Sequence, residues 1–233
     1  TAAYLDSTPI AVHCVDTPHI FDIQITAFHG EDSAFVRIVD YHTNLVCIRR
    51  NGETLLEKEC VTREDGLIGR SCLSVEGIVA FADTVNLGNV QEVLERQIAY
   101  NMDIAEEGLR GNYGANIGST ILLGRESDIN CKMRAWAAAA SDARMNGCEK
   151  PVVINSGSGN QGITVSVPVI EYARELGASD ETLCRALALS NLIAIHEKAG
   201  IGRLSAYCGA VSAGCAAGCG IAYLQGADLK AVS

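Results

Sequence analysis

The sequence is short of positive charge, of long apolar runs and of aromatic residues, and each shortage narrows the class of protein. Lys and Arg together number 18 against 28 for Asp and Glu, so the formal net charge is -10. A nucleic-acid-binding surface needs clustered Lys and Arg to contact phosphates, and nucleic acid is therefore not an expected partner. Residues 206–224 form the most apolar stretch, but glycines interrupt it, and no run reaches the about 18 apolar residues of a membrane-spanning helix. We expect no membrane contact.

Several catalytic motifs are also missing. The sequence contains no G-x-S-x-G, H-E-x-x-H or C-x-x-C, so serine hydrolase and zinc protease functions have no support. It does contain ten cysteines, which are dispersed and lie largely in apolar, helix-like sequence, and it shows no signal-peptide pattern. These features favour buried thiols or a metal site in a reduced, cytoplasmic protein over a disulfide framework.

The hydrophobic pattern predicts an α+β fold with two parts. Residues 1–68 form a strand-rich part, because apolar and polar side chains alternate over residues 20–27, 34–39, 44–48 and 53–57 and turn residues separate these runs. Asn51-Gly52 is a strong hairpin signal. The expected arrangement is an antiparallel meander.

Residues 69–233 form a helical part. Apolar residues recur there at helical spacing. The expected helices cover residues 75–85, 90–107, 128–145, from within 156–162 to 176, 179–198, from about 203 onward, and a new start at 228–230. Glycines at 108, 111, 114 and 118 predict a loop over residues 108–118.

The sharpest local signal is a glycine-rich segment between a short apolar run and a helix. It comprises Asn155, Ser156, Gly157, Ser158, Gly159, Asn160 and Gln161, followed by another glycine. Backbone N–H groups of such a turn and of the helix N-terminus form a cradle for an anion such as a carboxylate. A flexible Gly/Ser turn is the alternative, with even odds on the segment alone. The spacing matches neither a phosphate-binding loop nor a dinucleotide fingerprint.

Three polar residues interrupt the Ala-rich end of the helix expected over residues 128–145. They are Ser141, Asp142 and Arg144. Arg144 is suited to clamp a substrate carboxylate with two parallel hydrogen bonds. A solvated helix end is the alternative explanation.

Cysteines and histidines offer further candidates. Cys208, Cys215 and Cys219 fall on one helical face, but about 10 Å of helical rise separates the first two. A shared metal cluster would therefore need a helix break at a glycine, and buried apolar thiols are the favoured alternative. His42, with Thr43 and Asn44 beside it, is placed to act as an acid, a base or a hydrogen-bond donor.

These residues together resemble a known family. The segment from SDARM at residues 141–145 to SGSGNQGIT at residues 156–164, with His42-Thr43-Asn44 and Leu204-Ser205-Ala206 leading to Cys208, resembles the L-cysteine desulfidase-like proteins. More distantly, it is similar to the α chain of iron-sulfur L-serine dehydratase.

The resemblance implies a lyase with a 4Fe-4S cluster. Such an enzyme converts L-cysteine to sulfide, ammonia and pyruvate, or L-serine to ammonia and pyruvate. The motif residues at 42–44, 141–144 and 155–161 would bind the substrate, and Cys208 would be the first of three cluster ligands. No catalytic residue is assigned within the chain.

The resemblance also places two cluster ligands beyond Ser233 and the proton-abstracting cysteine before Thr1. Residues 69–233 would then be a catalytic-type domain that lacks the C-terminal part of the family domain. The chain is thus expected to be an internal fragment with an incomplete cluster and no turnover by itself. A non-catalytic amino-acid-binding or regulatory module of the same fold is the alternative function. Strand edges and small-residue helix faces make a homodimer an expected assembly.

Overall fold

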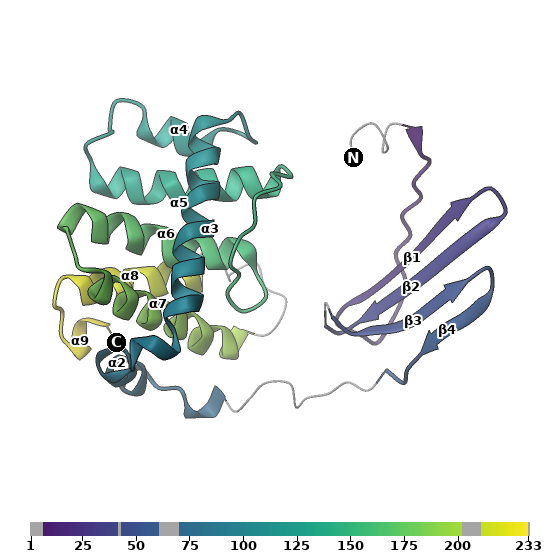
Figure 1. Cartoon of the computed structure of the whole chain (residues 1–233), viewed down its shortest axis with the longest axis horizontal. Helices are drawn as coiled ribbons and strands as arrows, with labels where there is room; N and C mark the ends of the chain where they lie inside the picture. Colours follow the sequence, from purple (N-terminus) through teal and green to yellow (C-terminus); the bar gives the residue numbers. More distant parts are fainter. Residues whose placement is uncertain (1–6, 42, 61–69, 202–210, 233) are drawn as a thin grey trace. The chain divides into compact units, whose positions relative to one another are not determined.

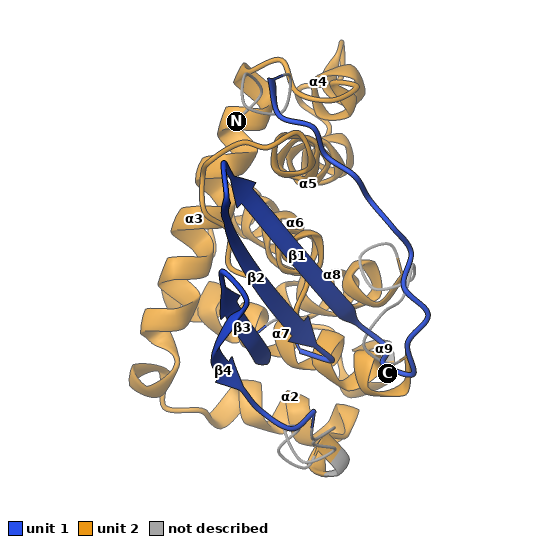
Figure 2. Cartoon of the chain, turned by 90° about the vertical axis from the view of Figure 1, so that its right-hand side faces the viewer, with its two compact units in different colours: residues 1–68 blue, residues 69–233 orange. Residues whose placement is uncertain are grey.

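The chain divides into a strand-rich unit and a helical unit, residues 1–68 and 69–233 (Figure 2). The structure is a computed structural model that describes residues 7–41, 43–60, 70–201 and 211–232. A four-stranded antiparallel sheet comes first and helices follow, so the predicted α+β class is confirmed.

The sheet is a simple meander whose strands lie in chain order (Figure 1). Its strands are β1 (Asp22–His29), β2 (Asp32–Val39), β3 (Leu45–Arg50) and β4 (Glu53–Glu57). Asn51 and Gly52 have φ values of 50° and 85°, the left-handed conformation that a tight hairpin requires. The predicted hairpin and meander are therefore confirmed.

An ion pair holds β1 to β2. Two nitrogens of Arg37 donate to the two carboxylate oxygens of Asp22, at 3.0 and 2.7 Å, and the Thr17 hydroxyl donates to the same carboxylate. The Arg37 guanidinium lowers the pKa of Asp22 to about 2, so the pair stays charged through ordinary acid conditions.

The helical unit is a stack of helices with one long helix across it (Figure 1). The described elements are η2 (Arg70–Cys72), α2 (Val75–Thr84), η3 (Leu87–Asn89), α3 (Gln91–Arg110), α4 (Ile117–Leu122), α5 (Ile129–Met145), α6 (Gly159–Leu176), α7 (Asp180–Ile201), α8 (Ala213–Leu224) and α9 (Leu229–Val232). Helix α5 packs between α4 and α6, and α6 packs on α7 and α8, while α3 contacts α5, α6 and α7. The core lies between these helices and consists largely of small and β-branched side chains.

The loop predicted over residues 108–118 is present but shorter, and it spans residues 111–116. Helix α3 continues to Arg110, and α4 begins at Ile117. A Cβ on Gly108 would lie 2.5 Å from the carbonyl carbon of Ala139, and one on Gly118 would lie 2.6 Å from the Cβ of the same residue. These glycines allow α3 and α4 to approach α5 closely, so they mark helix packing rather than a loop.

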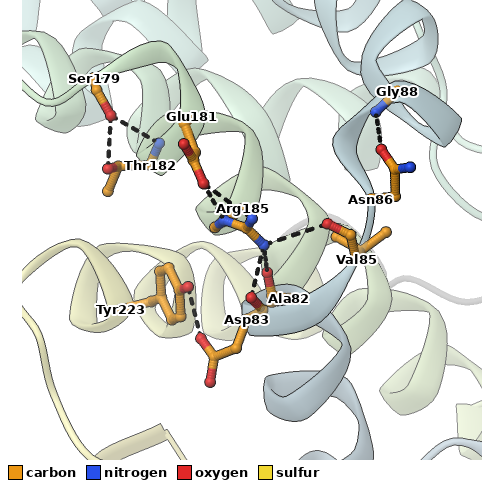
Figure 3. Close-up of polar contacts among 10 residues, drawn as sticks. All are labelled: Ala82, Asp83, Val85, Asn86, Gly88, Ser179, Glu181, Thr182, Arg185 and Tyr223. Carbon is orange, nitrogen blue, oxygen red and sulfur yellow. Dashed lines mark hydrogen bonds and ion pairs between the residues drawn. The ribbon is translucent and has the colours of Figure 1, made fainter.

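Arg185 of α7 fixes the end of α2 (Figure 3). Its guanidinium donates to the carbonyl oxygens of Ala82 and Asp83 at 2.7 and 2.9 Å, and it pairs with Glu181 one turn earlier. The last carbonyls of a helix have no intrahelical donor, so this contact satisfies them. Tyr223 of α8 donates to the Asp83 carboxylate at 2.8 Å, and helix α2 is thereby tied to both α7 and α8.

The C-terminal helices agree with expectation where the structure describes them. The helix expected from about residue 203 is described only from Ala213, because residues 202–210 lie outside the described part. The short helix α9 agrees with the start predicted at residues 228–230. Among the described helices, none combines the length and the apolar character that crossing a membrane requires.

Candidate functional site

The glycine-rich segment forms a tight, hydrogen-bonded turn that leads into α6. The backbones of Asn155 and Ser158 exchange two hydrogen bonds, of 3.1 and 3.0 Å, around Ser156 and Gly157. Both central residues have positive φ values, 49° and 82°. Glycine adopts this conformation without strain and serine only rarely, so the turn has a specified geometry.

The first turn of α6 presents free donors. The Ser158 hydroxyl caps the helix by accepting from the N–H of Gln161 at 3.2 Å. The N–H groups of Gly159 and Asn160 have no acceptor within the described ranges. Unpaired N–H groups at the positive end of a helix dipole attract an anion.

Arg144 adds a full positive charge at this helix end. Its guanidinium donates to the Asn160 side-chain oxygen at 3.1 Å, and a Cβ on Gly159 would lie 2.6 Å from its Cζ atom. Arg144 makes no ion pair with any carboxylate that the structure describes. The structure thus brings two of the predicted features together, the glycine-rich turn and the arginine that follows Ala143.

Neutral amide side chains from α3, α6 and α7 hold the turn in place through hydrogen bonds. Asn155 donates to the side-chain oxygen of Asn191 on α7 at 2.9 Å, and Asn191 donates to Gln97 of α3 at 2.8 Å. The side-chain nitrogen of Gln97 donates in turn to the side-chain oxygen of Asn191 at 3.0 Å. Gln161 donates to the Asn155 oxygen at 3.2 Å. We call these four residues the amide network.

Asn101 fastens the strand-like segment before the turn to α6. Its side chain is fully buried, and it accepts from the N–H of Val153 at 2.8 Å. Its amide group donates to the carbonyl of Gly162 at 3.1 Å and to the Ser166 hydroxyl at 2.9 Å. A Cβ on Gly162 would lie 2.8 Å from the Cα of Ile154, so only glycine permits this approach.

Sequence reasoning did not identify Gln97, Asn101 or Asn191. A usable signal exists on α3, where Leu94, Gln97, Asn101 and Ile104 are buried at intervals of three or four residues. Two amides on the buried face of a helix need partners, since buried polar groups are almost always hydrogen-bonded.

A pocket of about 370 Å³ lies beside the turn. Asn155 and Ser156 contribute to its wall together with Gln97 and Asn191 of the amide network, and Asn89 and apolar side chains complete it. The apolar lining comes from α2, α3, the segment before the turn and α7, and comprises Phe81, Val90, Val93, Leu94, Val153, Ile154, Ala188, Leu192 and Ile195. The volume is in the range of small-molecule sites.

The remaining predicted site residues have other placements. The Asp142 carboxylate accepts from the N–H of Ile117 at 2.9 Å and so caps α4, while Ser141 is half-buried on α5. Asn44 donates to the carbonyl of Val39 at 2.8 Å within the turn from β2 to β3, where Thr43 is exposed. Their roles in substrate binding stay predictions.

His42 and Cys208 lie outside the described residues. On α8, Cys219 is buried as predicted, but Cys215 is exposed, because the helix turns it away from the core. The Glu197 carboxylate beside Cys215 raises the pKa of that thiol to about 12. Within residues 7–41, 43–60, 70–201 and 211–232, no three His, Cys, Asp or Glu side chains are grouped as metal ligands. The described residues by themselves therefore do not fit a 4Fe-4S cluster.

Comparison with known proteins adds independent information. The family model for the serine dehydratase alpha chain matches residues 29–233. A UPF0597 protein of Desulfitobacterium hafniense is 52% identical over 224 residues, which cover 96% of this chain and 52% of that protein. A UPF0597 protein of Treponema denticola is 44% identical over 236 residues, 98% of this chain and 55% of that protein. The chain spans about half the length of these curated relatives. No solved structure matches it.

Proposed function

The chain belongs to the serine dehydratase alpha chain family, and we propose that the protein is a lyase that eliminates the β-substituent of a small L-amino acid. The family match confirms the resemblance to the serine dehydratase α chain that the motifs indicated. L-Serine and L-cysteine are the proposed substrates, since a hydroxyl and a thiol leave from the same carbon.

The cationic end of α6 is the observation that carries the proposal. A substrate carboxylate placed there would accept from the free N–H groups of Gly159 and Asn160 and would face the Arg144 guanidinium. Each of these donors is oriented by the protein before the ligand arrives, so little ordering is needed on binding. The pocket that Asn155 and Ser156 of the turn help to line would offer room for the rest of a small amino acid.

The reaction itself needs few groups. A base removes the α-proton, the electron pair forms the Cα–Cβ double bond, and the C–O or C–S bond breaks as the leaving group takes up a proton. The resulting aminoacrylate becomes an imine, which water converts to pyruvate and ammonia. In this scheme the turn and Arg144 hold the carboxylate and so fix the Cα–H bond relative to the base.

The family resemblance implies a 4Fe-4S cluster, with Cys208 as one ligand. Because the described residues do not form such a site, no step above depends on it. The cluster and its ligand remain part of the proposal for the whole protein.

A ligand pair tests the proposal. L-Serinamide differs from L-serine in having no carboxylate, so titration calorimetry should show tighter binding of L-serine. Arg144→Gln should weaken L-serine binding by about tenfold or more, since charge-assisted hydrogen bonds contribute about 1.5–3 kcal/mol, and should leave L-serinamide unaffected. Arg134→Gln is the matched control, because Arg134 is an exposed arginine ten residues earlier on α5.

Turnover provides the second readout. Pyruvate release from L-serine and sulfide release from L-cysteine are measured anaerobically on the protein expressed from its complete gene. We expect Arg144→Gln to lower kcat/KM for both substrates. Equal binding of L-serine and L-serinamide by the unaltered protein, or no release of product from either amino acid, would contradict the proposed function.

A further inference from the structure

Gln161 has one buried polar atom that nothing in the described chain satisfies. The residue is fully buried in the first turn of α6. Its side-chain nitrogen donates to Asn155 at 3.2 Å, but its side-chain oxygen Oε1 has no donor within the described residues. Such an unpaired acceptor is costly, and native structures contain few of them.

The amide network fixes which atom of Gln161 is left over. The Asn155 oxygen accepts from both Gln161 and the Ser156 hydroxyl, and the Asn155 nitrogen donates to Asn191. Asn191 in turn donates to Gln97 and to the carbonyl of Leu187. Rotating the Gln161 side-chain amide by half a turn would place its oxygen against the side-chain oxygen of Asn155. The direction of donation along the network therefore leaves Oε1 as the unpaired acceptor.

We propose that Oε1 of Gln161 accepts a hydrogen bond from the α-ammonium group of the amino-acid substrate, and this inference rests on the proposed function. An α-amino acid carries its ammonium one carbon away from its carboxylate. The carboxylate donors are the N–H groups of Gly159 and Asn160, the two residues immediately before Gln161. One helix turn thus offers donors for the anionic end of the ligand and an acceptor for its cationic end.

Within the described ranges, no acidic side chain forms an ion pair with Arg144 at this helix end. Asp142 is the acidic residue nearest to Arg144 in sequence, and its carboxylate is engaged at the start of α4. A neutral acceptor in the same helix turn as the carboxylate donors leaves the positive charge of Arg144 available to the ligand carboxylate. Gln161 can therefore bind the ligand ammonium without forming an ion pair with Arg144, which binds the ligand carboxylate.

The oxygen is enclosed when no ligand is bound, so the side chains that cover it must shift as the ligand enters. The two backbone hydrogen bonds between Asn155 and Ser158 and the amide network hold the turn. A Cβ placed on Gly157 would have no other atom within 4 Å, so there is open space on that side of the turn. This requirement makes ligand specificity depend on the interior of the turn as well as on its surface.

The test compares L-serine with 3-hydroxypropanoate, which keeps the carboxylate and the hydroxyl but has no ammonium. Calorimetric titration of the unaltered chain should show L-serine binding more tightly by about tenfold or more. Gln161→Met should reduce this preference to about twofold or less while binding of 3-hydroxypropanoate persists. Gln225→Met is the control, because Gln225 is a glutamine outside the amide network whose side-chain nitrogen donates to the Tyr172 hydroxyl.

The outcomes separate this inference from the proposed function. A retained preference in Gln161→Met would overturn it, as would equal loss of preference in Gln225→Met, since the effect would then not be specific to the acceptor of Gln161. If Gln161→Met does not fold, Gln161→Glu provides the test: it keeps an oxygen acceptor and should retain or strengthen the preference for L-serine. Failure of the proposed function appears differently, as no preference of the unaltered chain for L-serine over L-serinamide.

Discussion

Replacing Asn101 with aspartate tests how the turn is held in place. The two side chains have the same shape, so the substitution leaves packing unchanged and removes only the amide donor. That donor serves three acceptors, the carbonyls of Val153 and Gly162 and the Ser166 hydroxyl, at 3.3, 3.1 and 2.9 Å. The bond that Asn101 accepts from the Val153 N–H, of 2.8 Å, survives the change.

The expected cost follows from these contacts. The Gly162 carbonyl keeps one donor, because the Ser166 hydroxyl also donates to it at 2.8 Å. The loss of the Asn101 donor therefore affects the Val153 carbonyl most. Each buried group left unpaired costs about 1–3 kcal/mol, and we expect Asn101→Asp to lower the free energy of unfolding by about 3 kcal/mol. The new carboxyl would face carbonyl oxygens in a fully buried position, which raises its pKa in the folded state.

A raised folded-state pKa gives the variant a characteristic pH dependence. Above the unfolded pKa of about 4, the folded variant retains a proton that the unfolded chain has lost, so its stability falls as the pH rises. Urea unfolding followed by circular dichroism at pH 5 and pH 8 measures the difference. Asn112→Asp is the control, because Asn112 is exposed and its oxygen only accepts a bond from Asn116. A loss below about 1 kcal/mol at pH 8, with no dependence on pH, would refute the reasoning.

Two further predictions concern Arg144 and the sheet. Gly159→Ala should weaken L-serine binding in calorimetry, because the added methyl group would lie 2.6 Å from the Cζ of Arg144 and displace the guanidinium. The melting temperature should stay within a few degrees. Unchanged affinity would show that the position of the guanidinium is unimportant. In the strand-rich unit, Asp22 has its pKa lowered to about 2 by Arg37, so its contribution to stability is present above about pH 4 and is lost as the pH falls toward 2. Asp22→Asn should remove that part of an acid unfolding curve, and an unaltered curve would contradict the ion pair's role.

Local sequence signals predicted most elements because each end is set by neighbouring residues. Helix α5 was expected over 128–145 and spans Ile129–Met145, since the Asp128 side chain caps it and Gly147 follows with a φ of 84°. The α6 helix ends before Gly177, which has a φ of 62°, for the same reason. The N-terminal meander followed equally from alternation and from the Asn51-Gly52 hairpin.

The parts that escaped prediction depend on contacts between distant residues. Gly108 was assigned to a loop because its sequence neighbours do not reveal that Ala139 lies against it. The amide network joins Gln97 to Asn191, 94 positions apart, and no local pattern encodes that pairing. Arg144 and the glycine-rich turn were both selected as candidates, but only the structure places the guanidinium against the first residue of α6.

The division between neutral and charged groups explains how the turn can be both rigid and receptive. All of the side chains that hold it, from Asn101 to the amide network, are uncharged, so their hydrogen bonds neither neutralise Arg144 nor change with pH. Charged side chains in their place would have neutralised Arg144 or changed their hydrogen bonds with pH, because a carboxylate close to the guanidinium would have formed an ion pair with it. Neutral amides thus stabilise the shape of the turn while the positive charge and the free N–H groups of α6 remain available. This arrangement is suited to a ligand that supplies the missing negative charge itself.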